Sequence, residues 1–365
     1  MVINQSHKWR RLVEIFINGR FLTQKITGVQ RFALEIIKRI NQYTECKVIV
    51  LVPKNYNYIH AIRDVEVRKI GVNSGHLWEQ IDLYKYVKSK PLINLCNTAP
   101  IIKRNQIVVI HDTAVYSAPN GFSKLFKIWY KVLFFFISKL SKKILTISNF
   151  SSKEILKYLN ISKTKLAQIS EGTEHIKEVK ENKDVLGKYG LEKGKYVFAV
   201  SSLNPNKNFE ALIKATQFFQ EKSFNIVIAG GTDPKVFGIS NFEGNNIKYL
   251  GYITDEDLKG LYMNAGCFVF PSIYEGFGLP PLEAMSVGCP VVVSRIGPIP
   301  EVCEDAAIYF DPYDERDLAN KILMVMNDEL LKKELQSKGY QQAQKFSWQN
   351  ASRQLANHTS CLNFE

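Results

Sequence analysis

The chain has 365 residues, of which 45% are hydrophobic and 23% charged, and its formal net charge is +13. This hydrophobic content excludes a disordered chain, and the length suits one large domain or two medium ones. The positive charge indicates an anionic partner, which could be nucleic acid, an acidic lipid surface or a phosphate-bearing small molecule.

The spacing of the cysteines and the lengths of the apolar runs indicate the cellular compartment. The six cysteines form no C-x-x-C pair, which argues against a disulfide framework and a zinc site. The apolar run Leu12–Ile17 is short and carries Glu14, so no signal peptide is expected. No run reaches the roughly 18 apolar residues of a membrane span. We expect a cytoplasmic protein, with a peripheral position on the inner face of the plasma membrane as an alternative.

Short apolar runs alternate with helical patterns along the whole chain. Helical patterns stand out at Val29–Ile40 and Lys124–Leu140. The apolar runs are typical of buried parallel strands. They comprise Val13–Ile17, Val48–Val52, Ile93–Leu95, Ile107–Ile110, Ile144–Ile147, Tyr196–Val200, Asn225–Ala229, Ile247–Leu250, Cys267–Phe270 and Val291–Ser294.

This alternation predicts the α/β class, with two Rossmann-like, doubly wound domains. We place the first domain at 1–178, a linker rich in Lys, Glu, Asn and Gly at 179–195, and the second domain at 196–345. A last segment, 346–365, is predicted to be a helix that crosses back to the first domain. Ligands bind at the carboxyl ends of parallel strands, so we expect the two domains to face each other across a ligand-binding cleft.

A glycine- and proline-rich segment after the strand Cys267–Phe270 carries two glutamates. Gly276 and Gly278 permit close approach of backbone amides to a ligand. The two prolines that follow suit a first helical turn, which would put Glu283 in that turn and Glu275 on the loop before it. Such carboxylates could hold sugar hydroxyls beside a phosphate. Alternatively, Glu283 only complements the helix dipole and Glu275 is solvated.

In this segment the chain resembles the retaining glycosyltransferase family 4, of the GT-B type with two Rossmann-like domains. The family's hallmark of two glutamates separated by seven residues matches Glu275 and Glu283 within the phrase Glu-Gly-Phe-Gly-Leu-Pro-Pro-Leu-Glu-Ala-Met. Further matches are Gly288-Cys-Pro-Val-Val, Ile299-Pro-Glu-Val and the phrase that ends at Trp348. Together they extend from about residue 14 to about residue 355.

The resemblance implies roles for these residues. Glu275 would contact hydroxyls of the donor sugar and Glu283 the nucleotide ribose. The amides near the sugar and diphosphate would come from Gly276, Phe277, Gly278 and Leu279. The resemblance also implies front-face attack by the acceptor, a nucleoside diphosphate sugar as donor and no obligatory cofactor or metal.

The loop after Tyr196–Val200 carries Lys207, which could neutralise a diphosphate, and Asn208, which could cap the next helix. The resemblance suggests an Arg as well as the Lys in this loop. Ser202 stands where that Arg would be expected, which leaves Lys207 as the main cation. The alternative is a solvated lysine.

Three further turns follow predicted strands. Gly28 opens a helix and would lie near the donor phosphates by resemblance, or be a plain turn glycine. His111 follows the strand Ile107–Ile110, where the resemblance suggests contact with donor or acceptor sugar; a structural histidine is the alternative. Ser148 resembles the family's serine loop or caps a helix.

The stretch 122–143 combines lysines with aromatic residues and has no acidic residue. It could rest as an amphipathic helix on an anionic membrane surface, or be a core helix with solvated lysines. Nucleic-acid binding is not favoured, because no recognisable module accompanies the charge.

These observations predict a retaining hexosyltransferase of cell-surface polysaccharide synthesis, with Glu275, His111 and Lys207 as its catalytic residues. Its acceptor would be a glycan or a polyprenyl-linked glycan. The phrases Gly75-His-Leu-Trp78-Glu-Gln and Asn94-Leu-Cys-Asn97-Thr-Ala-Pro100 resemble mannosyltransferases and related enzymes of bacterial surface polysaccharide assembly, which favours GDP-mannose over UDP-hexoses as donor. A sugar-nucleotide epimerase on a similar fold and a non-enzymatic binder of anions or nucleic acid are the alternatives.

Overall fold

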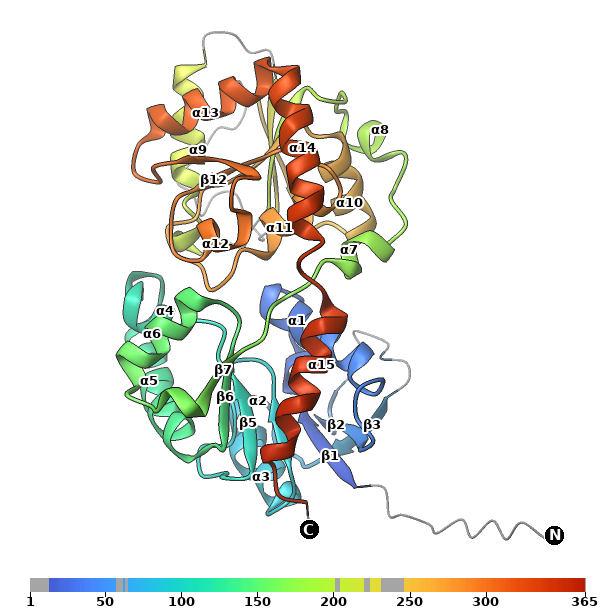
Figure 1. The fold of residues 1–365 in the computed structure, drawn as a ribbon, viewed down its shortest axis with the longest axis vertical. Helices are drawn as coiled ribbons and strands as arrows, with labels where there is room; N and C mark the ends of the chain where they lie inside the picture. Colours follow the sequence, from blue (N-terminus) through green and yellow to red (C-terminus); the bar gives the residue numbers. More distant parts are fainter. Residues whose placement is uncertain are drawn as a thin grey trace, which may run out of the picture. The chain divides into compact units, whose positions relative to one another are not determined.

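The computed structural model describes residues 13–56, 62, 65–200, 204–219, 224–230 and 246–364. The chain divides into two compact units, which Figure 1 shows with the elements labelled. Unit 1 comprises Met1–Val109, Phe136–Ile144 and Ser352–Glu365, and unit 2 comprises Ile110–Phe135 and Leu145–Ala351. The domain bounds drawn from the sequence stay predictions.

The first sheet has seven strands in the order β3-β2-β1-β4-β5-β6-β7. Its registers are parallel wherever they are defined, for example between Phe16 and Ile49 and between Phe16 and Leu92. The strands are β1 (Glu14–Asn18), β2 (Lys47–Pro53), β3 (Glu66–Ile70), β4 (Leu92–Asn94), β5 (Gln106–Val109), β6 (Lys143–Thr146) and β7 (Leu166–Gln168).

The second sheet has six strands in the order β10-β9-β8-β11-β12-β13 and is parallel throughout. Its two central strands are paired through Cys267 with Val197 and Phe268 with Phe198. The strands are β8 (Tyr196–Val200), β9 (Asn225–Ala229), β10 (Ile247–Gly251), β11 (Cys267–Phe270), β12 (Val291–Ser294) and β13 (Ala307–Phe310).

Helices connect the strands in both sheets, which confirms the predicted α/β class. They are α1 (Gly28–Ile40), α2 (Gly75–Leu77), α3 (Tyr84–Val87), α4 (Ala114–Ser117), α5 (Lys124–Leu140), α6 (Asn149–Leu159), α7 (Glu174–Glu178), α8 (Val185–Tyr189), α9 (Phe209–Ala215), α10 (Asp255–Asn264), α11 (Leu279–Ser286), α12 (Ile299–Cys303), α13 (Glu315–Asn327), α14 (Glu329–Ala343) and α15 (Trp348–His358). Short 3-10 turns and one π-helical segment, Trp78–Leu83, complete the described elements.

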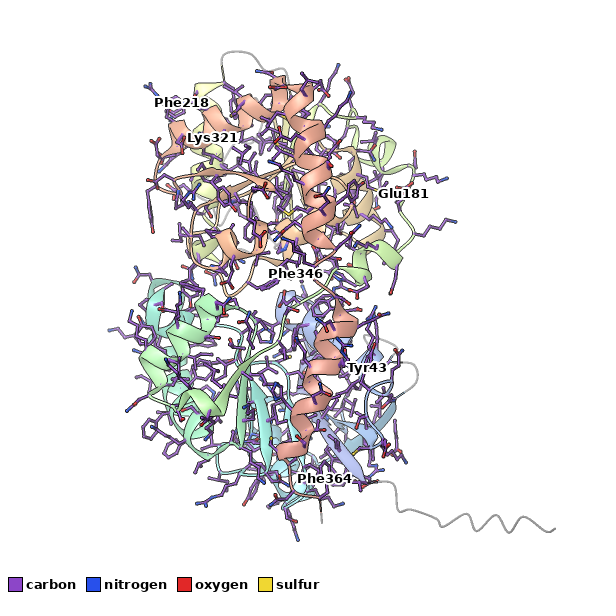
Figure 2. All side chains as sticks on the ribbon, in the orientation of Figure 1. Tyr43, Glu181, Phe218, Lys321, Phe346 and Phe364 are labelled. Atoms are coloured by element: carbon purple, nitrogen blue, oxygen red, sulfur yellow. The ribbon has the colours of Figure 1, made fainter. Side chains whose placement is uncertain are left out.

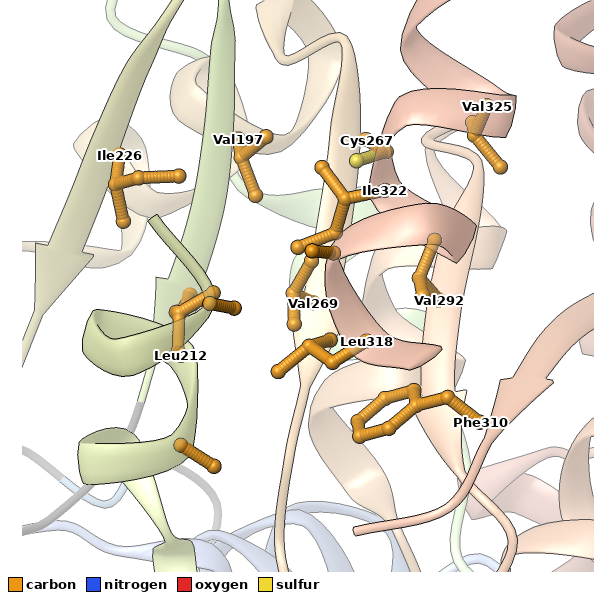
Figure 3. Packing of buried hydrophobic residues seen from close by; sticks show 14 of the residues in the cluster. Val197, Leu212, Ile226, Cys267, Val269, Val292, Phe310, Leu318, Ile322 and Val325 are labelled. Atoms are coloured by element: carbon orange, nitrogen blue, oxygen red, sulfur yellow. The ribbon is translucent and has the colours of Figure 1, made fainter. Parts of the chain in front are cut away.

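Each unit has a core of its own. In unit 1, Phe16, Ile49 and Trp78 belong to a buried cluster on the first sheet. In unit 2, side chains of α9 and α13 pack on the second sheet, where Leu212 and Leu318 meet the strands in Figure 3. Cys267 is fully buried in this cluster. The apolar faces of these helices hold them against the sheet.

The strand order of each sheet reverses at one point, and such points position ligand-binding loops. In the second sheet the reversal lies between β8 and β11, so the loops that leave these two strands converge at one edge. In the first sheet it lies between β1 and β4. There Arg20 donates from Nε to Glu79 Oε2 at 3.1 Å, and both side chains are buried.

Helix α5 presents two apolar stripes. Leu133, Phe134 and Ile137 are buried, as expected for a helix that packs on a core. Leu125 and Ile128 are 81% and 61% exposed on a second stripe. No helix in the described part of the chain is long and apolar enough to cross a membrane.

Candidate active site

The loop that leaves β11 passes very close to the backbone of the segment after β5, which also belongs to unit 2. A Cβ atom on Gly276 would lie 2.6 Å from the carbonyl oxygen of His111 and 3.2 Å from Cβ of Asp112, so only glycine fits there. Gly278 ends the loop with φ +120°, a conformation that favours glycine. The two glycines therefore set the path of the chain between Phe270 and α11.

Helix α11 begins directly after this loop, at Leu279. Pro280 and Pro281 lie in its first turn as predicted, and because proline has no N–H, the amides of Leu279 and the preceding loop are the ones left to meet a ligand. The prediction that Glu283 lies in the first turn is wrong, because the helix starts one residue before the prolines. Glu283 follows Leu279 by a full turn, beyond the reach of the dipole effect that would explain it structurally.

Lys207 and Glu275 form an ion pair at this edge of the sheet. Lys207 Nζ donates to Glu275 Oε1 at 2.6 Å, and the lysine ammonium lies 5.5 Å from the centre of the Phe270 ring. Their side chains are only 22% and 13% exposed, which contradicts the alternatives of a solvated lysine and a solvated glutamate. The pair brings together the loops that follow β8 and β11.

Backbone contacts hold the β8 loop in place. Ile273 N donates to the carbonyl of Asn206 at 2.8 Å, and the Asn204 side chain accepts from Asn206 N at 2.9 Å. Asn208 occupies the N-cap position of α9, but the prediction that its side chain caps this helix is wrong. Its Nδ2 donates instead to the carbonyl of Pro312 at 2.9 Å, since its φ of +53° turns it from the helix start. Ser202 lies outside the described residues.

Two serines join the segment after β5 to the loop 271–278, which we call the glycine loop. One is Ser148, the N-cap of α6, and the other is Ser151 within α6. Ser148 accepts from Ser151 N at 2.9 Å, which confirms the predicted cap, and its own hydroxyl donates to the Gly276 carbonyl at 2.6 Å. Ser151 Oγ lies 2.8 Å from the His111 carbonyl and 3.0 Å from that of Gly276. His111 is thus fixed beside the loop, with its ring 3% exposed.

Buried carboxyl groups surround His111 and Glu275. Glu171 Oε1 lies 3.9 Å from His111 Nδ1, and Glu171 Oε2 has no hydrogen-bond partner. Burial, reinforced by the charges of Glu283 and Glu275, raises the pKa of Glu171 well above its usual range. Burial also raises the pKa of Asp112, with Glu275 adding to the shift and the Ala114 amide and Lys207 opposing it. Both shifts favour the protonated form of a carboxyl group beside His111 and Glu275.

Glu283 is buried and held by two donors. His175 Nε2 lies 2.7 Å from Glu283 Oε1, and the Tyr262 hydroxyl donates to Oε2 at 3.2 Å. Behind the histidine, Trp348 Nε1 donates to His175 Nδ1 at 2.9 Å. A buried carboxylate needs such partners, so this network explains how Glu283 stays inside unit 2.

Most of the predicted site residues lie in unit 2, where contacts link the loops of Lys207, Glu275 and His111. Phe277 and Leu279 are buried, and the Phe277 ring packs edge-on against Phe346, the residue labelled between α14 and α15 in Figure 2. Gly28 belongs to unit 1, where it is the first residue of α1 after the Thr27 capping box. Its predicted role stays a prediction.

Sequence reasoning missed Glu171, His175 and Tyr262. Glu171 and His175 follow β7, a three-residue strand without a clear apolar run. The signal that could have found them is Gly172, since glycines a few residues after a strand also marked the loop that follows β11. Among the described residues, no group of three or more His, Cys, Asp or Glu side chains could hold a metal ion.

Comparison with known sequences gives a match over residues 180–345 to the family described as glycosyl transferases group 1. The chain is also 30% identical over 371 residues to O-antigen chain mannosyltransferase B of Escherichia coli, with 91% of this chain and 95% of the relative covered. The match to the relative thus extends over both sheets.

Comparison with solved structures gives similar folds. Sucrose-phosphate synthase from Thermosynechococcus elongatus aligns with a TM-score of 0.75 at 16% identity, covering 95% of this chain and 98% of that one. Anabaena HepE in complex with UDP and glucose aligns with a TM-score of 0.75 at 18% identity, covering 96% and 100%. These neighbours share the GT-B fold that the sequence predicts.

Proposed function

We propose a reaction for a chain that belongs to the glycosyl transferases group 1 family and is a glycosyltransferase: it moves a hexose from a nucleoside diphosphate sugar to a glycan or lipid-linked glycan. Transfer proceeds with retention of the anomeric configuration. Family membership does not favour the epimerase or the non-enzymatic binder considered from the sequence.

One observation carries this proposal. The Lys207–Glu275 ion pair lies where the strand order of the second sheet reverses, at the loops leaving β8 and β11. A lysine has three donors and an ionised carboxylate about four acceptor positions, so each partner can keep the pair and still bind a ligand. Lys207 can then donate to an anion while Glu275 accepts hydrogen bonds from hydroxyl groups. A nucleotide sugar carries both, an anionic diphosphate and the hydroxyl groups of its sugar.

In the proposed reaction, Lys207 and the amides of Gly276 to Leu279 stabilise the charge of the departing diphosphate. Such electrostatic stabilisation is usually the largest catalytic contribution in sites of this kind. Glu275 orients the sugar, Glu283 accepts from the ribose, and His111 contacts the reacting sugar or orients the acceptor. The acceptor hydroxyl oxygen attacks the anomeric carbon on the face that the diphosphate leaves, and the bond between that carbon and the diphosphate oxygen breaks. The proton of the acceptor hydroxyl passes to the departing diphosphate, and no protein nucleophile is used.

Mannose is the proposed sugar and GDP-mannose the proposed donor. The support is the 30% identity, over nearly the whole chain, to a relative named as an O-antigen chain mannosyltransferase. By the same reasoning we place the reaction in cell-surface polysaccharide synthesis, in the cytoplasm. A nucleotide sugar is the only small molecule that this chemistry requires.

A panel of nucleotide sugars tests the donor, because a ligand that binds the folded state raises its stability by mass action. We expect GDP-mannose to raise the melting temperature more than UDP-glucose or UDP-N-acetylglucosamine at equal concentration. Proton NMR of the glycosylated product then reads the anomeric configuration. A larger shift with a UDP-sugar would refute the donor, and an inverted product would refute retention.

The exposed stripe of α5 supports a second proposal, that the enzyme contacts an anionic membrane surface. The stripe consists of apolar residues spaced three or four positions apart, and lysines 124, 127, 131 and 139 stand on the same helix without an acidic residue. Apolar side chains entering the lipid boundary beside lysines at the headgroups are typical of interfacial helices. The stripe comprises Leu125, Ile128, Val132, Phe135 and Phe136.

A further inference from the structure

The hydrogen-bond network behind Glu283 indicates which ring nitrogen of His175 carries the proton. The indole Nε1–H of Trp348 is a donor only, so its 2.9 Å contact requires His175 Nδ1 to accept. A neutral imidazole then carries its proton on Nε2, which lies 2.7 Å from Glu283 Oε1. His175 therefore donates to Glu283, and Trp348 sets the tautomer in which it does so.

Contacts of the neighbouring residues Glu174 and Gly172 also hold the backbone around His175 in place. Its neighbour Glu174 accepts from Ser347 Oγ at 2.6 Å and from Trp348 N at 2.9 Å, so the start of α7 is tied to the start of α15. A Cβ atom on Gly172 would lie only 2.1 Å from Trp348 N, which leaves room for glycine alone. The rings of His175 and Trp348 are thus held at a set separation.

We propose that His175 is a positioning residue for Glu283, and that Trp348 keeps it in the donating tautomer. With His175 on Oε1 and Tyr262 on Oε2, each oxygen of Glu283 retains one acceptor position. Two acceptor positions on one carboxylate match the two neighbouring hydroxyls of a ribose. The inference rests on the proposed function, in which Glu283 binds the nucleotide ribose.

The position of the network predicts which kinetic constant it controls. The ribose does not react, so an interaction with it contributes about equally to substrate and transition-state binding and affects KM rather than kcat. Without His175, Glu283 Oε1 has lost its donor, and the Glu283 side chain is free to turn away from the ribose. A merely structural histidine would lower the melting temperature without separating the two constants.

The test measures kcat and KM for the donor, together with the dissociation constant of GDP, in the full-length enzyme. His175→Leu is expected to raise the KM and the dissociation constant roughly tenfold to a hundredfold, the size of a lost hydrogen bond to a charged group, with kcat little changed. His175→Gln restores an N–H donor and is expected to recover most of the affinity. Trp348→Phe is expected to weaken binding several-fold.

Trp78→Phe is the matched control, because Trp78 is also buried and donates from Nε1, to the Ile70 carbonyl in unit 1. Unchanged GDP affinity in His175→Leu, or no recovery in His175→Gln, would overturn the proposal. If His175→Leu does not fold, equal affinities of Trp348→Phe and Trp78→Phe would overturn it. Native enzyme that binds neither GDP nor UDP would instead refute the proposed function.

Discussion

At the scale of single residues, the site consists of charged groups that pair with one another or shift one another's pKa. Lys207 and Glu275 are paired at 2.6 Å, and Asp112 and Glu171 are pushed toward their protonated forms by burial and by neighbouring carboxylates. A site with several carboxyl groups and one paired lysine suits a ligand that offers many hydroxyls and one compact anion. A nucleotide sugar has this composition.

Lys207→Met tests the electrostatic role of the lysine. The change removes the ammonium at the diphosphate position while keeping an unbranched side chain, and we expect kcat to fall on the order of a hundredfold, as for loss of one stabilising donor. Steady-state kinetics at saturating donor measures it. Lys214→Met is the control, since Lys214 pairs with Glu210 on the exposed face of α9. Native kcat in Lys207→Met would contradict the assignment.

Glu171→Gln tests the buried carboxyl group. The folded-state pKa of Glu171 is raised above its usual 4.5, so the folded protein binds the proton more tightly than the unfolded chain. Stability is therefore lost as pH rises from this usual value through the folded-state pKa. The variant lacks this titration, so its free energy of unfolding should rise relative to that of the native protein as pH increases.

Urea unfolding from about pH 5 to about pH 8 measures this difference. Glu210→Gln serves as the control, because Glu210 pairs with Lys214 at an exposed position. A difference between Glu171→Gln and native protein that stays constant across this range would show that Glu171 titrates alike in both states.

At the scale of elements, the glycine loop determines how closely its neighbours approach. Gly276→Ala would force a Cβ to within 2.6 Å of the His111 carbonyl, so we expect the loop to shift and transfer activity to fall at least tenfold. Gly194→Ala is the comparison, because nothing lies within 4 Å of its Cβ position, just before β8 and at the end of that strand opposite to the loop of Lys207. Its φ of +74° makes it a test of backbone strain without a steric clash. Activity and melting temperature of both variants decide the matter, and equal activities would contradict the argument.

The elements predicted from sequence are those with strong periodicity. The buried runs Tyr196–Val200 and Cys267–Phe270 coincide with β8 and β11, and Lys124–Leu140 coincides with α5. The missed strands, β3, β7 and β13, are all edge strands in their sheets. An edge strand is less covered than a central one, so β3 and β7 need no continuous apolar run. The strand β13 does have such a run, Ala-Ile-Tyr-Phe, and its apolar pattern was overlooked.

Helix α5 yields a prediction about membranes. Replacing Leu125, Ile128 and Phe135 by Ser removes the three most exposed side chains of the apolar stripe but no buried side chain, so we expect vesicle binding to fall at least tenfold while the melting temperature holds. Co-sedimentation with vesicles containing anionic lipid measures it, and vesicles of neutral lipid are the control. Undiminished binding by the variant would refute the membrane contact.

At the scale of the whole molecule, the sequence predicted the loops but not their mutual contacts. The two-glutamate phrase located Glu275 and Glu283, yet the Lys207–Glu275 pair joins loops separated by 68 residues. Likewise, the partners of Glu283 come from α7 and α10, with Trp348 of α15 behind them. Such contacts depend on the strand order, which no local pattern contains. Family membership then adds the reaction class.

The central claim is that this site transfers a hexose from a nucleoside diphosphate sugar, and Glu275 tests it most directly. The measurement is the rate of sugar transfer from labelled GDP-mannose to a lipid-linked glycan, for native enzyme, Glu275→Ala and the exposed control Glu210→Ala. We predict transfer by the native and control proteins, and a loss of at least about a hundredfold in Glu275→Ala. Undiminished transfer by Glu275→Ala would contradict the account.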